Sequence, residues 1–415
     1  MEELNIKGQK AKNASYFLAK ASSAKKDEVL TTAAAMLIEN MNAILEANQQ
    51  DLSKAEENGV KGALLDRLKL TKERIEGMAD GLTQIAGLED PIGEILSMKK
   101  RPNNLIIGKR RVPMGVIGII YEARPNVTAD AFGLCLKTGN ATILRGGKEA
   151  IHSNTAVVKV LQNALEKNGF PGESVQLVEN TSRDSAVAMM KLNEYLDLLI
   201  PRGGAGLINA VVQNSTVPVI ETGVGNCHVY IDDAAELQMA VNITHNSKTH
   251  RPGVCNAAES LLIHKDLVET FAPVICKALI ESKVEIRGDE TIQKYVPQAK
   301  AATEEDWATE YLDYIMAVKV VDSLDDAIQH INKYGSMHTE VIVTDNYTNA
   351  QRFLEEVDAA AVYVNASSRF TDGMEFGFGA EIGISTQKLH ARGPMGLKEL
   401  TSSKYIIYGS GQVRQ

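Results

Sequence analysis

The order of apolar and polar residues divides the chain into a helical N-terminal part and a longer part in which strands and helices alternate. Residues 8–58 are rich in Ala, Leu, Lys and Glu, and their apolar positions follow helical spacing. That spacing is clearest at Leu37, Ile38, Met41, Ile44 and Leu45. Gly59 is expected to end this helical region. A second helical stretch over 61–87 ends near Asp90 and Pro91.

Residues 94–121 predict a β-hairpin. The sequence RPNN, which is typical of a turn, separates the extended runs EILSMK and LIIGKRRV. Near the end of the chain, SSKYIIYGSG predicts a lone short strand. We expect this strand to pair with the hairpin in a subunit interface.

From GVIGIIY at 115–121 onward, short apolar strands alternate with helices of roughly 10–15 residues. The first block of strands comprises TILRGG, ESVQLVE, LDLLIPRGG, VPVIETG (217–223) and HVYID. A second block, from about 226 to 390, comprises SLLIH, MAVKVV, TEVIVTD and AAVYVN. This alternation indicates βαβ units and an α/β fold with parallel sheets.

Composition and charge narrow the classes of function. The 415 residues are 44% hydrophobic and 23% charged, with a formal net charge of −9. A mildly acidic chain argues against a nucleic-acid partner, because phosphate backbones bind basic faces. No apolar run approaches the roughly 18–20 residues of a membrane span, and the N-terminal sequence lacks the apolar core of a signal peptide. We expect a cytoplasmic protein with no membrane partner.

The four cysteines are few and widely spaced, and no CxxC occurs, so neither a metal site nor a disulfide framework is indicated. Cys276 and Cys135 have apolar neighbours and predict core positions. Cys227 follows GVGN, where a turn would expose it, but only His228 lies nearby in sequence to help ionise it.

Cys255 has a different local sequence, NSKTHRPGVCNAAES. Lys248, His250 and Arg251 precede it closely, a Pro-Gly pair forces a turn, and the residues after it begin a new element. Nearby cations or a helix N-terminus lower a thiol pKa and favour the reactive thiolate. Local chemistry leaves two readings open: a reactive cysteine, or a structural turn.

Six further segments, which together span most of the chain, carry recognisable motifs. They are PMGVIGIIYEARPNVTADA (113–131), LCLKTGNATILRGGKEAIHSN (134–154), IPRGGAGLI (200–208), VPVIETGVGNCHVY (217–230), KTHRPGVCNAAESLLIH (248–264) and GFGAEIGIST with HARGPMGL (377–397). In this order they resemble the aldehyde dehydrogenase superfamily, and within it the branch that reduces γ-glutamyl phosphate.

The resemblance implies an aldehyde-dehydrogenase-like α/β fold with a Rossmann-type cofactor domain, an α/β catalytic domain and a small β oligomerisation flap. It assigns residues 1–93 and 114–225 to the cofactor domain and 226–398 to the catalytic domain. The flap would combine 94–113 with 399–415, and a homo-oligomer is expected.

The resemblance also implies roles for single residues. Cys255 falls on the nucleophile, and Glu221 on the glutamate that related enzymes use as a base. Reducing an acyl phosphate needs no water, so Glu221 either tunes the thiol or is vestigial; on its own it would read as a strand-end carboxylate. The family's oxyanion-hole asparagine aligns with Glu122 in YEARPN, which leaves Asn126 and the Cys255 backbone N–H as candidate donors.

For the cofactor, TILRGGKEA matches the strand and loop that hold the adenosine ribose. Lys148 stands where many NAD-preferring relatives carry glutamate, and a cation attracts a 2′-phosphate, so NADP(H) is predicted. The alternative is that Lys148 is a solvated turn residue. The implied cofactor-binding residues are Arg145, Gly146, Gly147, Lys148, Gly203, Gly204 and Glu310.

The implied reaction is NADPH-dependent reduction of γ-glutamyl phosphate to glutamate 5-semialdehyde and phosphate through a cysteine thioester, in proline biosynthesis. Arg124, Arg251 and Arg369 are the candidates for binding the substrate's anionic groups, although a surface ion pair is the commoner fate of an arginine. The acyl phosphate would come from a separate glutamate kinase, a candidate partner. The rival hypotheses are a hydrolytic aldehyde dehydrogenase and a catalytically inactive nucleotide-binding scaffold.

Overall fold

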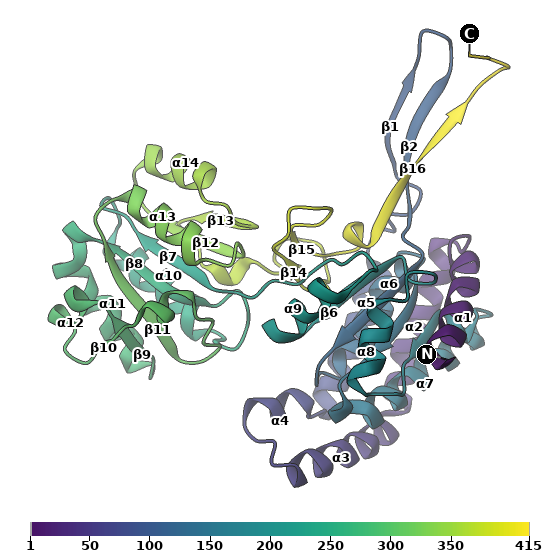
Figure 1. Cartoon of the computed structure of the whole chain (residues 1–415), viewed down its shortest axis with the longest axis horizontal. Coiled ribbons are helices and arrows are strands. Elements are labelled where there is room, and N and C mark those ends of the chain that lie inside the picture. The colour runs from purple at the N-terminus through teal and green to yellow at the C-terminus, as the bar shows by residue number, and fades with distance from the viewer. Residues whose placement is uncertain (1, 415) are drawn as a thin grey trace. The chain divides into compact units, whose positions relative to one another are not determined.

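The computed structural model describes residues 2–414, which form two compact units (Figure 1). The first unit contains the chain up to Glu221 together with Gly377–Gly383 and the segment from Met395 onward. The second contains Thr222–Phe376 and Ile384–Pro394. Each unit has its own parallel sheet, so the α/β class predicted from the alternation of strands and helices is confirmed.

The first unit holds a four-stranded parallel sheet in the order β5-β4-β3-β6. Its strands are β3 (Val116–Tyr121), β4 (Ala141–Arg145), β5 (Val175–Leu177) and β6 (Leu198–Arg202). The chain runs outward from β3 through β4 to β5, and β6 then returns to the other side of β3. In open parallel sheets, ligands bind at the carboxyl ends of the strands that flank such a reversal.

Helices that pack on this sheet and on one another make up most of the rest of the first unit. They are α1 (Glu2–Leu18), α2 (Ser23–Glu39), α3 (Met41–Glu57), α4 (Ala63–Leu68), α5 (Lys72–Gly87), α6 (Asn126–Lys137), α7 (Ile151–Lys167), α8 (Arg183–Met190) and α9 (Ala205–Asn214), with 3-10 turns η1 (Lys148–Ala150), η2 (Gly172–Ser174) and η6 (Lys398–Leu400). Side chains of Ser22, Thr71 and Ser182 cap α2, α5 and α8 by accepting a backbone N–H. Gly59, with a φ of +77°, lies just beyond α3, which fits the predicted stop.

The strand predicted over 217–223 is wrong. Apart from one bridge between Leu199 and Val219, this segment is irregular. Pro218 has no backbone N–H to donate to a ladder. The apolar residues Val217 and Ile220 are nevertheless buried. The apolar character of this segment is therefore explained by its packing against β6 and does not require a regular strand.

A three-stranded antiparallel sheet in the order β1-β2-β16 also belongs to the first unit. Its strands are β1 (Ile95–Lys100), β2 (Ile106–Pro113) and β16 (Thr401–Tyr408). The predicted hairpin and its pairing with the C-terminal strand are confirmed, with Thr401 opposite Pro113 and Tyr408 opposite Ile106. Figure 1 shows this sheet projecting from the helices of the same unit. Its role in a subunit interface stays a prediction.

The second unit holds a seven-stranded parallel sheet in the order β10-β9-β11-β8-β7-β12-β13. Its strands are β7 (Cys227–Ile231), β8 (Ala258–His264), β9 (Glu285–Gly288), β10 (Lys300–Ala301), β11 (Ile315–Val321), β12 (Thr339–Val343) and β13 (Ala361–Val364). Its helices are α10 (Leu237–Thr249), α11 (Val268–Glu281), α12 (Glu290–Tyr295), α13 (Leu324–Tyr334) and α14 (Tyr347–Glu356), with 3-10 turns η3 (Lys265–Leu267), η4 (Glu304–Ala308) and η5 (Ser368–Phe370). A small ribbon pairs β14 (Ile384–Ser385) with β15 (Gly393–Pro394). The central strands β7 and β8 are buried throughout.

The C-terminal part of the chain is divided between the units. The segments 377–383 and 395–398, which the sequence analysis grouped with the catalytic domain, belong to the first unit. They pair with each other there: the Ile382 N–H donates to the Met395 carbonyl, and the Met395 N–H to the Gly383 carbonyl. The assignment of one unit to the cofactor and the other to catalysis stays a prediction. Among the helices of residues 2–414, none combines the length and apolar character needed to cross a bilayer.

Candidate active site

Cys255 lies in the loop between α10 and β8, at the amino-terminal edge of the seven-stranded sheet. Because the strands are parallel, the segments that precede β7, β11 and β12 reach the same edge. All four cysteines are described, and Cys255 is the one whose side chain is not buried. The sheet therefore gathers several loops around the cysteine that the family resemblance predicts as the nucleophile.

The other cysteines have environments that disfavour a thiolate. Burial raises the pKa of Cys135 and of Cys276 to about 12, which confirms the predicted core positions. The expectation that a turn exposes Cys227 is wrong, because Cys227 is the buried first residue of β7. Burial, followed by the charge of Glu340, raises the pKa of Cys227 well above its usual range. Its thiol donates to the Cys255 carbonyl at 3.1 Å.

The residue after Cys255, Asn256, anchors the loop. The Asn256 side-chain amide donates to the Thr371 carbonyl at 2.8 Å, and the Ser368 hydroxyl donates to the Asn256 carbonyl at 2.7 Å. These bonds fasten the Cys255 loop to η5 and the turn after it. Neither partner is near Asn256 in sequence, so local pattern could not reveal them.

Two of the predicted substrate arginines lie around this loop. Burial lowers the pKa of Arg369, and the positive charge of Arg251 lowers it further, whereas the negative charge of a Cys255 thiolate acts in the opposite direction. The Arg369 Nε group donates to His250 Nδ1 at 3.3 Å. Arg369 is thus within electrostatic range of both Arg251 and Cys255, and its positive charge favours a thiolate and an anionic ligand.

Lys248 does not serve as the free cation that the sequence analysis expected. Its ammonium group lies 2.5 Å from the Glu259 carboxylate, and both side chains are completely buried. Burial raises the pKa of Glu259 to about 7, although Lys248 opposes that shift. In addition, a strand and not a helix begins after Asn256, so the element that follows Cys255 supplies no helix N-terminus to the thiol.

Glu310 is linked to the loop that carries Cys255 through Gly225. Its carboxylate accepts the Gly225 N–H at 2.7 Å. A Cβ atom on Gly225 would lie 1.6 Å from the Cys255 carbonyl oxygen, so only glycine fits there. Sequence reasoning missed Gly225; the one available signal was its place in the ETGVGN motif.

The predicted cofactor residues other than Glu310 lie in the first unit, at the carboxyl edge of its sheet. Arg145 ends β4, Gly146 and Gly147 follow it, and Lys148 begins η1 with an exposed side chain. Arg145 donates to the carbonyls of Thr181 and Ser182 at 2.7 and 2.9 Å. Its guanidinium group is therefore engaged by protein carbonyls, which leaves Lys148 as the exposed cation of the loop.

The same edge has features that fit a bound dinucleotide. The Nδ2 atom of Asn154 is buried without a hydrogen-bond partner in the described chain, and a Cβ on Gly146 would lie 2.1 Å from it. Gly203 and Gly204 form the turn between β6 and α9, next to β3 at the reversal of strand order. An orphaned donor, closely packed glycines and a helix start are what phosphate-binding loops use.

Glu122 occupies part of this glycine turn, which the sequence analysis did not foresee. Its carboxylate accepts the Gly204 N–H at 3.0 Å, and a Cβ on Gly203 would lie 2.7 Å from the carboxylate carbon. The two segments are 82 residues apart in sequence. The parallel pairing of β3 with β6 brings them together.

The remaining predicted residues also belong to the first unit. Asn126 begins α6, and its side-chain amide donates to Asp130 at 3.1 Å. Arg124 lies just before that helix, and Glu221 is the last residue of the unit before Thr222. Their roles at Cys255, which belongs to the second unit, stay predictions.

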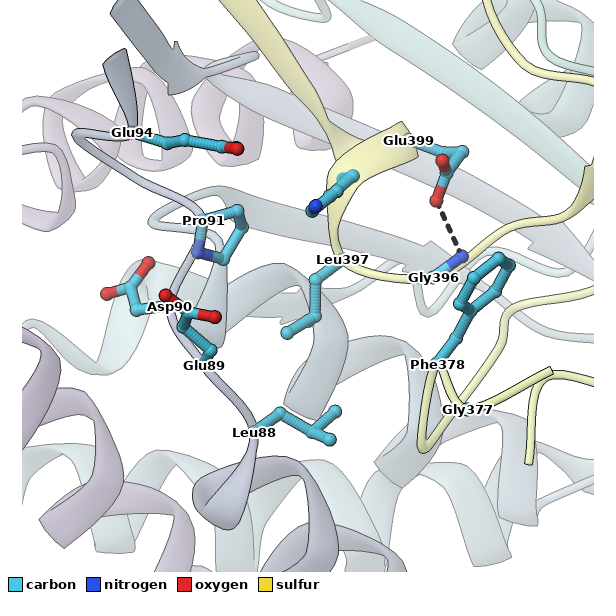
Figure 2. A pocket seen from close by; sticks show the side chains of 11 residues that line it. Leu88, Glu89, Asp90, Pro91, Glu94, Gly377, Phe378, Gly396, Leu397 and Glu399 are labelled. Atoms are coloured by element: carbon cyan, nitrogen blue, oxygen red, sulfur yellow. Dashed lines mark hydrogen bonds between the residues drawn. The ribbon is translucent and has the colours of Figure 1, made fainter. Parts of the chain in front are cut away.

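A cavity of about 320 Å³ in the first unit contains none of the predicted site residues (Figure 2). It is lined by Leu88, Glu89, Asp90, Pro91, Glu94, Gly377, Phe378, Gly396, Leu397, Lys398 and Glu399. Figure 2 shows the Glu399 carboxylate accepting the Gly396 N–H, a contact of 2.9 Å. This bond holds two lining residues on one side of the cavity.

Comparisons with known proteins place this geometry in a family. The model of the aldehyde dehydrogenase family matches residues 2–308 and 304–406. The chain is 62% identical over 414 residues, 100% of both chains, to gamma-glutamyl phosphate reductase of Clostridium botulinum strain Eklund 17B. A crystal structure of gamma-glutamyl phosphate reductase from Thermotoga maritima is 51% identical, with full coverage of both chains and a TM-score of 0.97.

A more distant structure shares the fold. The acetylating aldehyde dehydrogenase of Geobacillus thermoglucosidasius has a TM-score of 0.72 at 18% identity, covering 100% of this chain and 98% of its own. The two parallel sheets are thus the α/β architecture of aldehyde dehydrogenases, which confirms the predicted fold. The chain belongs to the aldehyde dehydrogenase family.

Proposed function

We propose that this protein reduces γ-glutamyl phosphate to glutamate 5-semialdehyde and phosphate with NADPH, through a thioester on Cys255, in proline biosynthesis. The observation that carries the proposal is a cysteine whose side chain is not buried, with Arg369 in electrostatic range of it and Arg251 close to it in sequence. This cysteine belongs to a chain that is 62% identical over its full length to a gamma-glutamyl phosphate reductase.

The first step uses groups of the second unit. The Cys255 thiolate attacks the acyl carbon, the bond from that carbon to the phosphate oxygen breaks, and phosphate leaves with the bond electrons. Arg251 and Arg369 favour the thiolate and bind the substrate's phosphate and α-carboxylate. Lys248 takes no part, because Glu259 neutralises it. The Cys255 backbone N–H, with Asn126 as its proposed partner, donates to the developing oxyanion.

The first unit holds the cofactor. Lys148 attracts the 2′-phosphate, while Gly146, Gly147, Gly203 and Gly204 let the backbone approach the dinucleotide closely. When bound, NADPH supplies the hydride that reduces the acyl carbon. Cys255 then leaves as a thiolate when the aldehyde is released. No water is consumed, so Glu221 is not needed as a hydrolytic base.

The antiparallel sheet of β1, β2 and β16 is the proposed site of homo-oligomer formation. Apolar side chains on it are exposed, among them Ile95, Leu96, Met98, Tyr405, Ile407 and Tyr408. Exposed apolar side chains on a projecting sheet are typical of a protein–protein interface. A kinase that makes the labile acyl phosphate is a second proposed partner, since direct transfer would protect the intermediate from hydrolysis.

The reaction run backwards gives the sharpest test. Glutamate 5-semialdehyde and NADP+ should give NADPH only when phosphate or arsenate is present, and Cys255→Ser should abolish the signal. Cys276→Ala, in the core of α11, should keep it. Oxidation of the semialdehyde at the same rate without phosphate would identify a hydrolytic dehydrogenase instead. Cofactor binding without turnover would identify an inactive scaffold.

A further inference from the structure

Glu310 lies in a short irregular segment between η4 and β11, and its environment holds that segment firmly. On one side, the Tyr311 hydroxyl donates to Asp306 at 2.7 Å, and Arg287 donates to the same carboxylate at 2.7 Å. On the other side, the Leu312 N–H donates to Glu259 at 3.1 Å. Glu310 is therefore presented by a segment that is anchored directly after it.

The anchor at Asp306 is itself well supported. Burial would raise the pKa of this carboxyl group, but hydrogen bonds from Thr303, Arg287 and Tyr311 outweigh burial and hold the pKa well below its usual range. Thr303 and Asp306 also form a capping box at the start of η4. The carboxylate stays charged at neutral pH and keeps its partners.

The Glu310 carboxylate reaches the segment before β7, where it accepts the Gly225 N–H at 2.7 Å. Gly225 packs directly on the nucleophile: a Cβ there would lie 1.6, 2.3 and 2.5 Å from the carbonyl oxygen, carbonyl carbon and Cα of Cys255. Any displacement of Gly225 is therefore transmitted to the Cys255 backbone. No flexible side chain lies between them to absorb it.

We infer that Glu310 is a positioning residue for Cys255, acting through Gly225, in addition to any contact it makes with the cofactor. Because it takes Cys255 as the nucleophile, this role rests on the proposed function. The charge of Glu310 does not explain its place here, since a nearby negative charge opposes thiolate formation. Its use is as a hydrogen-bond acceptor that fixes the segment against which Cys255 lies.

The experiment separates the two properties of Glu310, its hydrogen-bond acceptor and its negative charge. Glu310→Ala removes both, whereas Glu310→Gln removes the charge and keeps a carbonyl oxygen for the Gly225 N–H. Glu305→Gln is the matched control, because Glu305 is an exposed carboxylate on the neighbouring η4. The first measurement is hydrogen exchange, without cofactor, of peptides that cover 222–226 and 252–257.

In Glu310→Ala, we expect the amide hydrogens of both peptides to exchange about tenfold faster or more, since the hydrogen bond from the Gly225 N–H has lost its acceptor. Glu310→Gln and Glu305→Gln should exchange at nearly the parental rate. In turnover, kcat of Glu310→Ala should fall about tenfold or more below that of Glu310→Gln, because a displaced nucleophile slows the chemical step.

Two results would overturn this role. One is parental exchange in cofactor-free Glu310→Ala. The other is a pair of variants, Ala and Gln, that share the same kcat and differ from the parent only in KM for the cofactor, which would leave Glu310 a cofactor ligand alone. Failure of the proposed reaction is a separate outcome, because the exchange measurement needs neither substrate nor cofactor.

Discussion

The ammonium group of Lys248 lies 2.5 Å from the carboxylate of Glu259, and water reaches neither side chain. Lys248 is near the end of α10 and Glu259 is the second residue of β8. The ion pair therefore closes the base of the loop that carries Cys255. Burial lowers the pKa of Lys248 and raises that of Glu259 to about 7, while each partner favours the charged form of the other.

Removing one partner of this ion pair should lower the stability of the folded protein. We expect Lys248→Met to lower the free energy of unfolding by about 3–5 kcal/mol, because it leaves an unpaired buried carboxylate. The double variant Lys248→Met with Glu259→Met should recover most of that loss. Urea denaturation measures both. Lys277→Met, at an exposed pair in α11, is the control, and a loss below about 1 kcal/mol in Lys248→Met would contradict the expectation.

Gly225→Ala should damage the site more than a usual glycine substitution. The added methyl group would overlap the Cys255 backbone, so the loop must move, and we expect kcat to fall by about a hundredfold. Gly77→Ala is the matched control: nothing lies within 4 Å of the added Cβ in α5. That helix variant should keep its activity and gain about 0.5–1 kcal/mol of stability. Similar activity in the two variants would show that Gly225 has room to move.

Arg369→Gln should weaken the use of an anionic substrate. We expect kcat/KM for glutamate 5-semialdehyde to fall about a hundredfold, the size of a lost charge-assisted hydrogen bond or ion pair of about 2–3 kcal/mol. Steady-state kinetics at saturating cofactor measure this. Arg352→Gln removes an exposed arginine paired with Asp325 and Glu356, and it should stay within about twofold of the parent. An unchanged Arg369→Gln would remove that residue from the substrate site.

Lys148→Glu tests the cofactor preference. A carboxylate at this exposed position should repel a 2′-phosphate and accept a ribose 2′-hydroxyl. We expect kcat/KM for NADPH to fall about 10–100-fold, with little loss for NADH, as measured with each cofactor in turn. Lys159→Glu, at an exposed position of α7, should leave the ratio unchanged. An unaltered ratio in Lys148→Glu would mean that Lys148 is a solvated turn residue.

His330 should make stability depend on pH. Burial, helped by the charges of His228, Lys319 and Lys333, lowers its pKa to about 3. The unfolded chain takes up this proton near pH 6.5 and the folded protein does not. Its contribution is thus fully present above pH 6.5 and is lost as the pH falls toward 3.

The loss should be about 2 kcal/mol between pH 6.5 and pH 5, since each pH unit is worth about 1.4 kcal/mol for one proton. His330→Phe, which keeps a ring against Trp307 and Tyr334, should flatten the pH profile by that amount in urea titrations. The exposed residue His152 supplies the control substitution, His152→Gln. A slope unaffected by His330→Phe would show that His330 is not the group responsible.

The spacing of apolar residues predicted correctly those helices and strands that are set by neighbouring residues. Helical spacing predicted helices over 8–58 and their stop near Gly59, and the alternation of apolar strands with helices predicted the parallel α/β sheets. The division of 8–58 among α1, α2 and α3 was not predicted. The run 217–223 failed because its apolar side chains are buried without a strand. Burial and regular hydrogen bonding leave the same signature in a short apolar segment, so sequence cannot separate them.

The sequence by itself determined the α/β class and the family motifs, since both depend on short runs of neighbouring residues. Through the resemblance that those motifs carry, it predicts Cys255 as the nucleophile. Only the tertiary structure decided how charges and donors are paired. Lys248 looked like a partner for the thiol but lies against Glu259, Glu122 sits on Gly204, and Glu310 reaches Gly225. Parallel strands bring together residues far apart along the chain, and a buried charge such as Lys248 needs a partner that only the packing can supply.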